Sequence, residues 1–366
     1  MKVTGYQTRL LHTPADDPLA NSLPDTGRQR AFVTLEMTTD EGVDGVGLTF
    51  VPALTASPVA GALRMSVDAL AEMTVGEDPM EIEGIASRLQ EATSGAGPGG
   101  LLTMALAAVD MALWDIKGKA LGQTVASLLG GYRKSVPTYA SGALMRPVNV
   151  ERLAEIGPML VEKGFRQMKT QMGAEALASR EVDRIRTLRD AVGDDIDLMC
   201  DINQLWSVNR AIDVGRRVEE YNLYWLEDVV AHDDYQGMAK VADALYTPIC
   251  SGEYVYGVNP FRQLIENESV DIVMIDLLRV GGITPWRKVA AMAEAFNLPV
   301  VSHLVPEIHI QLMASIPNGL TVEYMPWSLQ LWEETPAFVD GNLEVPDKPG
   351  LGLAFDQDAL NHYVVA

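Results

Sequence analysis

The first third of the chain predicts two kinds of element in succession. Residues 31–48 (AFVTLEMTTDEGVDGVGL) alternate apolar and polar positions around an Asp-Glu-Gly turn, which predicts an antiparallel pair of strands. From about Pro79 to Leu129 the pattern is helical, and the stretch GGLLTMALAAVDMALWDIKGKALG has the Ala, Leu and Met content of a buried helix. Gly130 and Gly131 interrupt this pattern, so we place a domain boundary there.

Beyond the glycine pair, short β-prone runs alternate with amphipathic helical segments. The apolar positions of one such segment recur at three- and four-residue intervals before a glycine ends it: Val182, Ile185, Leu188, Val192 and Gly193. The β-prone runs are MKTQ (168–171), LMCDIN (198–203), YWLED (224–228), ICSGE (249–253), IVMID (272–276), VVSH (300–303) and TVEY (321–324). This alternation predicts a (β/α) array.

A polar residue ends each of these runs. The seven residues are Lys169, Asp201, Glu227, Glu253, Asp276, His303 and Glu323. With PTYAS (137–141) as a first strand, the array would close an eight-stranded barrel, whose active sites lie at the carboxyl ends of the strands. An open doubly wound sheet predicts the same alternation but would not bring so many strand ends to one centre. One acidic residue at such a place commonly caps the next helix, yet seven caps would more often be Ser, Thr and Asn.

Composition and charge narrow the class of protein. The 366 residues are 48% hydrophobic and 21% charged, which excludes disorder and coiled coil, and no apolar run approaches the roughly 18 residues of a membrane span. The first twenty residues lack the apolar core of a signal peptide. A net charge of −22 would repel nucleic acid and anionic membranes. Cys200 and Cys250 are too few for a disulfide framework, so we expect a cytoplasmic protein.

Three of the strand-end carboxylates predict a metal site. Asp201, Glu227 and Glu253, converging from successive strands, would repel one another unless a cation lay between them. All-oxygen ligation suits a hard ion, and Mg²⁺ is the expected one. Asn203 shares the inward face of Asp201 and is a candidate substrate contact. Asp228 follows Glu227 on the opposite face, where we expect it outside the ligand set or at the surface.

Asp276 and His303 end neighbouring strands of the predicted array. A carboxylate beside an imidazole fixes its tautomer and raises its basicity, which makes His303 a candidate general acid or base. The other four histidines have no such neighbour in the pattern, and we interpret them as structural: His12, His232, His309 and His362.

Taken together, these motifs resemble the mandelate racemase group of the enolase superfamily, also called the mandelate racemase/muconate lactonizing enzyme family. Its first signature is similar to AVDMALWDIKGKALGQTVASLLGG (108–131). The other motifs follow in the family's order: MKTQMG, MCDINQ, YWLEDV, CSGEY, DLLRVGGIT and SHLVPEIH. The resemblance implies an α+β capping domain (1–130), a modified TIM barrel of (β/α)₇β type (131–330), and a C-terminal segment (331–366) that packs back on the cap.

The resemblance also assigns roles to individual residues. It implies that Asp201, Glu227 and Glu253 bind Mg²⁺ and that Asp276 and His303 form the catalytic dyad. Glu323 matches the acid that hydrogen-bonds the substrate carboxylate. Lys169 matches the first lysine of the family's Lys-x-Lys motif, with an electrostatic role beside that carboxylate.

The second lysine of that motif is replaced by Gln171. In the family this lysine is the base on the face opposite the histidine, and a neutral amide cannot accept a proton. The replacement counts against racemisation and leaves Gln171 as a candidate substrate contact. Arg28 and Arg30 lie near the cap loops 19–33 and 48–61, which the resemblance places over the barrel mouth. We expect them either to hold a distal carboxylate or hydroxyl groups, or to be solvated surface residues.

These features predict a dehydratase that removes water from a sugar acid, an aldonate or aldarate, and yields a 2-keto-3-deoxy acid. Two alternatives remain: a racemase, epimerase or cycloisomerase of the same family, and a catalytically inactive barrel that binds a ligand. The expected partner is a small-molecule carboxylate, with no nucleic acid or membrane, and family members are commonly homo-oligomers.

Overall fold

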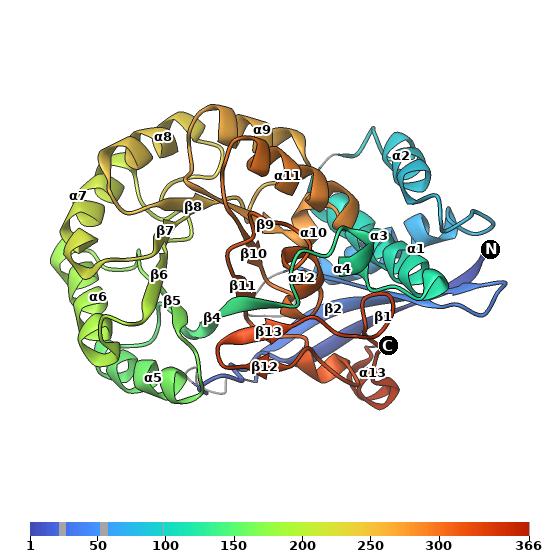
Figure 1. The fold of residues 1–366 in the computed structure, drawn as a ribbon, viewed down its shortest axis with the longest axis horizontal. Helices are drawn as coiled ribbons and strands as arrows, with labels where there is room; N and C mark the ends of the chain where they lie inside the picture. The colour runs from blue at the N-terminus through green and yellow to red at the C-terminus, as the bar shows by residue number, and fades with distance from the viewer. Residues whose placement is uncertain (22–26, 52–57, 98, 366) are drawn as a thin grey trace.

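The computed structural model of the chain describes residues 1–21, 27–51, 58–97 and 99–365. Figure 1 shows a sheet with helices on one side of the molecule and a ring of strands surrounded by helices on the other. Among the described residues, no helix is both long enough and apolar enough to span a membrane.

The N-terminal part begins with an antiparallel sheet in the order β1–β2–β3. Its strands are β1 (Val3–Pro14), β2 (Gln29–Thr39) and β3 (Gly45–Phe50). The predicted hairpin over 31–48 is confirmed as β2 and β3. Strand β1 was not predicted, because it is an edge strand on which most positions are partly buried or exposed and the apolar alternation is weak.

Two helices, α1 (Ala60–Glu72) and α3 (Gly100–Leu121), pack on this sheet, and α2 (Ile82–Ala92) packs against α3. The predicted buried helix is confirmed as α3, which packs directly on β3. A Cβ atom at Gly47 would lie 2.0 Å from the carbonyl oxygen of Ala108, so the close approach of α3 requires glycine there. The short helix α4 (Val125–Leu128) leads toward the barrel.

The barrel strands run parallel from β4 to β11, and neighbours in the chain pair with each other as far as β10. They are β4 (Ser135–Leu144), β5 (Gln167–Gln171), β6 (Asp197–Asp201), β7 (Trp225–Glu227), β8 (Ile249–Ser251), β9 (Ile272–Asp276), β10 (Val300–His303) and β11 (Val322–Tyr324). Strand β11 pairs with β4, and a parallel bridge from Val300 to Gly319 joins β10 to the segment before β11. The sheet therefore curls back on itself, which confirms the predicted fold class.

Helices surround the strands on the outside (Figure 1). They are α5 (Val150–Glu162), α6 (Ala178–Val192), α7 (Val208–Val218), η1 (Glu219–Tyr221), α8 (Tyr235–Ala244), α9 (Asn259–Glu266), α10 (Leu277–Val280), α11 (Ile283–Ala295) and α12 (Pro306–Met313). The predicted end of α6 is confirmed, because Gly193 follows its last residue with a φ of 80°. A separate cluster of buried side chains contributed by the strands fills the barrel interior: Tyr139, Met199, Trp225, Cys250, Ile272, Met274 and Val301.

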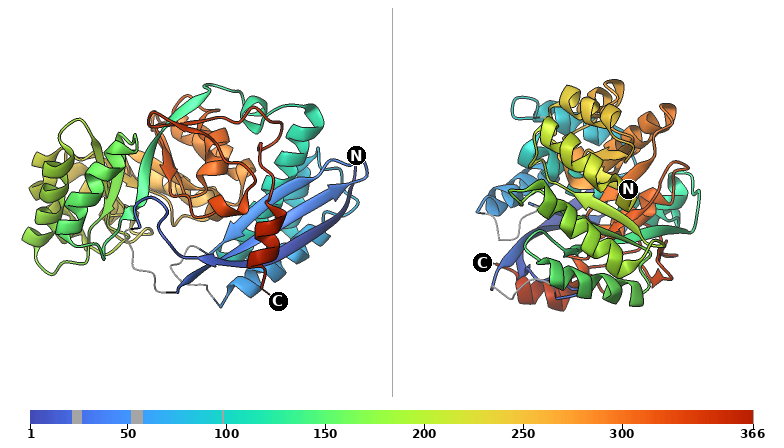
Figure 2. Two further views of the ribbon diagram at one scale, coloured as in Figure 1. Left: turned by 90° about the horizontal axis from the view of Figure 1, so that it is seen from below. Right: turned by 90° about the vertical axis from the view of Figure 1, so that its left-hand side faces the viewer.

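The C-terminal segment connects the two parts. After η2 (Leu329–Leu331), the hairpin of β12 (Phe338–Val339) and β13 (Asn342–Glu344) pairs antiparallel with the start of β4. Helix α13 (Gln357–Tyr363) then lies against the cap sheet, where Val364 bridges to Leu11 of β1 (Figure 2). The expected return of the C-terminal segment to the cap is confirmed.

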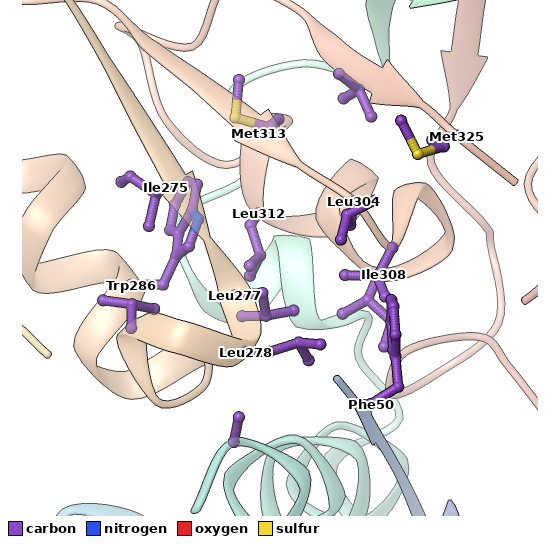
Figure 3. Packing of buried hydrophobic residues seen from close by; sticks show 14 of the residues in the cluster. Phe50, Ile275, Leu277, Leu278, Trp286, Leu304, Ile308, Leu312, Met313 and Met325 are labelled. Carbon is purple, nitrogen blue, oxygen red and sulfur yellow. The ribbon is translucent and has the colours of Figure 1, made fainter. Parts of the chain in front are cut away.

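Apolar side chains join the carboxyl ends of β9 and β10 to the cap. Figure 3 shows Leu277 and Leu278 of α10 and Ile308 of α12 packed near Phe50 at the end of β3. All four are at most 2% exposed. This packing sets the position of the cap relative to the strand ends where the polar residues gather.

Candidate active site

The carboxyl ends of the barrel strands enclose a cavity of about 580 Å³. Side chains at or just beyond most of these strand ends line it, together with Met325 and Trp327 from the segment after β11. The predicted site residues in its lining are Lys169, Gln171, Asp201, Asn203, Glu253, His303 and Glu323. Glu227 and Asp276 are buried and contact these lining residues.

Three carboxylates lie close together in the cavity floor. Oxygen atoms of Asp201, Glu227 and Asp228 all lie within 4.8 Å of one another, and all three side chains are buried. The expectation that Asp228 lies on the face opposite Glu227, or at the surface, is wrong, whereas its place outside the ligand set stays a prediction. Its φ of 44° is left-handed, so the side-chain alternation of β7 stops at Glu227 and Asp228 turns toward the same cluster.

The floor has the chemistry of a cation site. Burial raises the pKa of Asp201 to about 6, and the charge of Glu253 adds to that shift while Lys169 opposes it. Burial and neighbouring carboxylates also raise the pKa values of Glu227 and Asp228 well above the usual range. Oδ2 of Asp228 is buried with no hydrogen-bond partner among the described residues. An all-oxygen donor set with an unpaired buried oxygen fits a hard divalent cation.

Glu253, the third predicted ligand, adjoins this cluster but also contacts the imidazole. Its Oε2 lies 3.1 Å from Nε2 of His303, and its charge raises the pKa values of Asp201 and Glu227. The preceding Gly252 has a φ of 138°, and a Cβ atom there would lie 2.2 Å from the carbonyl oxygen of Met274. Glycine at this position therefore lets the chain turn after β8 and direct Glu253 into the cavity.

The structure brings Asp276 and His303 together at the ends of β9 and β10. Nδ1 of His303 lies 2.6 Å from Oδ2 of Asp276, whose Oδ1 accepts hydrogen bonds from the backbone N–H groups of Leu278 and Arg279. Because the carboxylate holds the proton on Nδ1, Nε2 is the ring nitrogen left to act as a base, and Oε2 of Glu253 is its contact at 3.1 Å. Burial alone would lower the pKa of His303, but Glu253, Glu323 and Asp276 outweigh it and raise that pKa.

Lys169 lies between two buried acids. Its Nζ is 2.6 Å from Oε1 of Glu227 and 2.9 Å from Oε1 of Glu323. Glu323 also accepts hydrogen bonds from the Ser141 hydroxyl at 2.8 Å and from the backbone N–H of Leu304 at 2.7 Å. Burial would raise the pKa of Glu323, but Lys169 and then His303 outweigh it and lower that pKa to about 2. Both side chains are therefore charged at neutral pH.

The backbone after His303 is strained. Leu304 and Val305 have φ values of 57° and 38°, and a left-handed conformation is costly for a β-branched residue. His309 contributes to holding this turn, because its Nδ1 lies 2.7 Å from the carbonyl oxygen of Leu304. The turn directs the Leu304 N–H at Glu323 and allows α12 to begin at Pro306.

A neutral hydrogen-bond network occupies the β5–β6 side of the cavity. Nε2 of Gln171 donates to Oδ1 of Asn203 at 3.1 Å and lies 3.5 Å from Oδ2 of Asp201. The backbone N–H of Asn203 donates to Oδ1 of Asp201 at 2.7 Å. Arg146 joins the network through its backbone N–H, which donates to Oε1 of Gln171 at 3.1 Å.

The structure does not bring the two cap arginines into the cavity lining. Arg28 is exposed, just before β2. Arg30 is only 2% exposed and lies behind Trp327, with its guanidinium 4.2 Å from that ring. Arg30 therefore supports a wall residue. It also donates to the carbonyl oxygens of Pro14 and Asp16 and lies 3.8 Å from the Asp16 carboxylate. Parts of the two predicted cap loops, residues 22–26 and 52–57, lie outside the described residues.

Several residues of the lining were not predicted from the sequence, among them Ser141, Arg146, Tyr254 and Trp327. Ser141 ends the predicted PTYAS run, but β4 continues to Leu144, so the sequence pattern misplaced the end of this strand. With the correct end, the rule that polar residues follow barrel strands would have pointed to Arg146. No pattern pointed to Trp327, because it follows the last barrel strand.

Family profiles match both parts of the chain. The profile for the mandelate racemase/muconate lactonizing enzyme N-terminal domain matches residues 7–130, and the enolase C-terminal domain-like profile matches residues 151–359.

Individual relatives match over nearly the whole chain. L-talarate/galactarate dehydratase of Salmonella typhimurium is 31% identical, covering 98% of this chain and 90% of its own length. The 3,6-anhydro-alpha-L-galactonate cycloisomerase of Streptomyces coelicolor is 31% identical, covering 98% of each. A crystal structure of L-talarate dehydratase from Polaromonas sp. JS666, complexed with Mg and L-glucarate, is 30% identical with a TM-score of 0.91, covering 100% of this chain and 98% of that one. The chain is therefore an enzyme of the mandelate racemase/muconate lactonizing enzyme family, within the mandelate racemase group of the enolase superfamily.

Proposed function

We propose that the protein is a Mg²⁺-dependent dehydratase of sugar acids, converting an aldonate or aldarate to a 2-keto-3-deoxy acid. The observation that carries this proposal is the asymmetry of the cavity. Asp276 holds Nδ1 of His303, which leaves Nε2, beside Glu253, as the nitrogen that can exchange a proton. A neutral amide, Gln171, occupies the family position of the second base. A site with acid–base chemistry on one face suits elimination better than racemisation, which needs groups on both faces.

One residue of the chain, His303, supplies both proton transfers of the proposed elimination. Nε2 of His303 removes the proton α to the carboxylate, and the electron pair of that C–H bond forms an enediolate. Lys169 stabilises the negative charge, and Glu323 holds the substrate carboxylate. The imidazolium then returns its proton to the departing β-hydroxyl group on the same side. Water leaves, and the resulting enol tautomerises to the 2-keto acid.

We assign the cation to Asp201, Glu227 and Glu253, with Asp228 beside them. Mg²⁺ bound there supplies positive charge that stabilises the developing charge on the substrate carboxylate. The fit of the buried carboxylates to a hard cation and the magnesium in the Polaromonas structure support this assignment.

The test is a screen of mono- and diacid sugars with Mg²⁺ that detects 2-keto acid. We expect at least one sugar acid to give this product, and His303→Asn to lower kcat by about 10²- to 10⁴-fold. His232→Asn is the matched control, because His232 bonds to Gln204 and is absent from the cavity lining. Formation of an epimer alone, or exchange of the α-proton in D₂O without water loss, would contradict the dehydratase proposal.

A second candidate is a cycloisomerase, favoured by the 31% identity to the Streptomyces coelicolor enzyme. Cycloisomerisation conserves the atoms of the substrate, whereas dehydration removes one water. Mass spectrometry of the product therefore distinguishes the two reactions, since an isomeric product favours the cycloisomerase. Binding of Mg²⁺ and a sugar acid with no turnover of any compound would instead support a ligand-binding barrel.

A further inference from the structure

Among the described residues, three strongly basic side chains line the cavity: Lys169, Arg279 and Arg146. Lys169 is paired with Glu227 and Glu323, and Arg279 lies 3.7 Å from Asp276. In the described part of the chain, Arg146 has no carboxylate within 4.0 Å and is the unpaired cation of the cavity lining. An unpaired charge in a half-buried position is costly unless a ligand or solvent compensates it.

The guanidinium of Arg146 is held in place by neutral acceptors. Its Nε donates to the carbonyl oxygen of Met172 at 2.6 Å, and one terminal nitrogen, Nη2, donates to Oδ1 of Asn203 at 2.9 Å and to the carbonyl oxygen of Ile202 at 3.3 Å. The other terminal nitrogen, Nη1, makes no hydrogen bond with any described residue. These contacts fix the plane of the group without neutralising it, and they leave donors for an anion.

Arg146 contacts other lining residues than those at the carboxylate-binding end of the site, and its charge opposes the rise that burial causes in the pKa of Asp201 in the floor. That end lies at Lys169 and Glu323, beside the carboxylate floor. Arg146 lies beyond Gln171 and Asn203, and Asn203 connects it to Asp201. A sugar acid whose first carboxylate lies at Lys169 would therefore extend its polyol chain past the two amides toward Arg146.

We propose that Arg146 binds a second carboxylate at the far end of the substrate, so that the enzyme prefers aldarates, which are diacids, to aldonates. This inference rests on the proposed dehydratase function and names its substrate class. It gives Arg146 the role that the sequence suggested for Arg28 or Arg30, neither of which lines the cavity. A purely structural role for Arg146 would make it equally important for both classes of substrate.

The experiment compares each six-carbon aldarate with the aldonate of the same configuration, such as a glucarate with the corresponding gluconate. For the wild-type enzyme we expect kcat/KM to be at least about tenfold higher for the diacid, as one charge-assisted contact would provide. Arg146→Gln should reduce this ratio at least about tenfold, and Arg146→Lys should reduce it less, because it keeps the charge but loses the fork of donors. Arg180→Gln, which removes an exposed arginine of α6, is the control and should leave the ratio unchanged.

Two further outcomes complete the test. The inference would be overturned if Arg146→Gln lowered kcat/KM equally for aldarates and aldonates, or if the wild-type enzyme did not prefer diacids. Neither result would contradict the dehydratase proposal. If no sugar acid is turned over, binding can still test whether Arg146 holds the second carboxylate. Titration calorimetry would compare a glucarate and the matching gluconate binding to the Mg²⁺-loaded protein. Tighter binding of the diacid that is lost in Arg146→Gln supports the inference, and equal binding overturns it.

Discussion

The two sides of the cavity differ in charge and in the way they are held. On the β9–β11 side, His303, Asp276 and Glu323 form a buried network of ionisable groups, held in part by the strained turn at Leu304. On the β4–β6 side, Gln171 and Asn203 form a neutral amide network beside Arg146. In the proposed reaction the first side moves a proton, and the second side holds hydroxyl groups and charge without exchanging protons.

From this difference we infer that one replacement within a shared fold, Gln171 for lysine, changes which reactions the site favours. Gln171 lies two residues after Lys169 on β5, where both residues face the cavity. An amide there accepts and donates hydrogen bonds but removes the second base, so the proposed chemistry proceeds from the histidine side alone. Four predictions test this asymmetry and the shared carboxylate floor, in order of decreasing effect.

The largest effect is expected from Asp276→Asn. The asparagine amide would donate to Nδ1 of His303, which would place the imidazole proton on Nε2 and remove the base that faces the cavity. We expect kcat to fall on the order of 10³- to 10⁴-fold with the fold intact. Gln171→Ala, on the other side of the cavity, should lower kcat only about tenfold. Comparable losses in kcat for the two variants would contradict the one-sided chemistry.

The next largest effect is expected on Mg²⁺ affinity at the carboxylate floor, which both sides of the cavity share. Asp228→Asn removes a charge from the cluster with Asp201 and Glu227, and we expect Mg²⁺ affinity, measured by calorimetry, to fall about 10- to 100-fold. Asp233→Asn, in the loop after β7, is the control for loss of one acidic charge. Unchanged affinity in Asp228→Asn would show that Asp228 takes no part in holding the cation.

A pH-dependent loss of stability is expected on the histidine side. Burial lowers the pKa of His309 to about 4, so between pH 6.5 and 4 the unfolded chain binds a proton that the folded chain excludes. The contribution of neutral His309 is therefore complete above pH 6.5 and is lost as the pH falls. Between pH 7.5 and 5 this amounts to about 2 kcal/mol.

Urea unfolding of the wild type and of His309→Asn at these two pH values measures this contribution. Asparagine has an amide that can replace the donor to Leu304 but does not titrate, so the variant should lose about 2 kcal/mol less than the wild type on acidification. Identical pH dependence of the two proteins would show that His309 is not held neutral.

The smallest effect is expected from Gln171→Lys, which restores a base on the amide side. A lysine would lose the hydrogen bonds to Asn203 and Arg146, so we expect kcat/KM for dehydration to fall about tenfold. Exchange of the α-proton in D₂O should at the same time appear for sugar acids of the opposite α-configuration, measured by NMR. Gln171→Met, which has a similar length and no base, is the control and should show no such exchange.

The outcome for individual residues shows where sequence reasoning succeeded and where it did not. Asp201, Glu227, Asp276 and His303 end their strands as predicted, because the carboxyl ends of parallel strands meet on one side of a barrel. Asp228 was misplaced because strand alternation was extended through a residue with a left-handed φ, which the pattern of residue types does not reveal. Strand β1 and the full length of β4 were missed because their burial is set by neighbours distant in the chain.

The sequence by itself determined the alternation of strands and helices in the barrel, the identity of the ionisable groups at the strand ends and the presence of Gln171 in place of the second lysine. These are local properties, set by hydrophobic period and residue type. Only the tertiary structure decided which charges are paired, because pairing depends on distances between strands and loops far apart in the chain. Three positions depended on such distances and were not predicted from the sequence. Arg30 lies behind Trp327, Asp228 belongs to the carboxylate floor, and Arg146 is the unpaired cation of the described cavity lining.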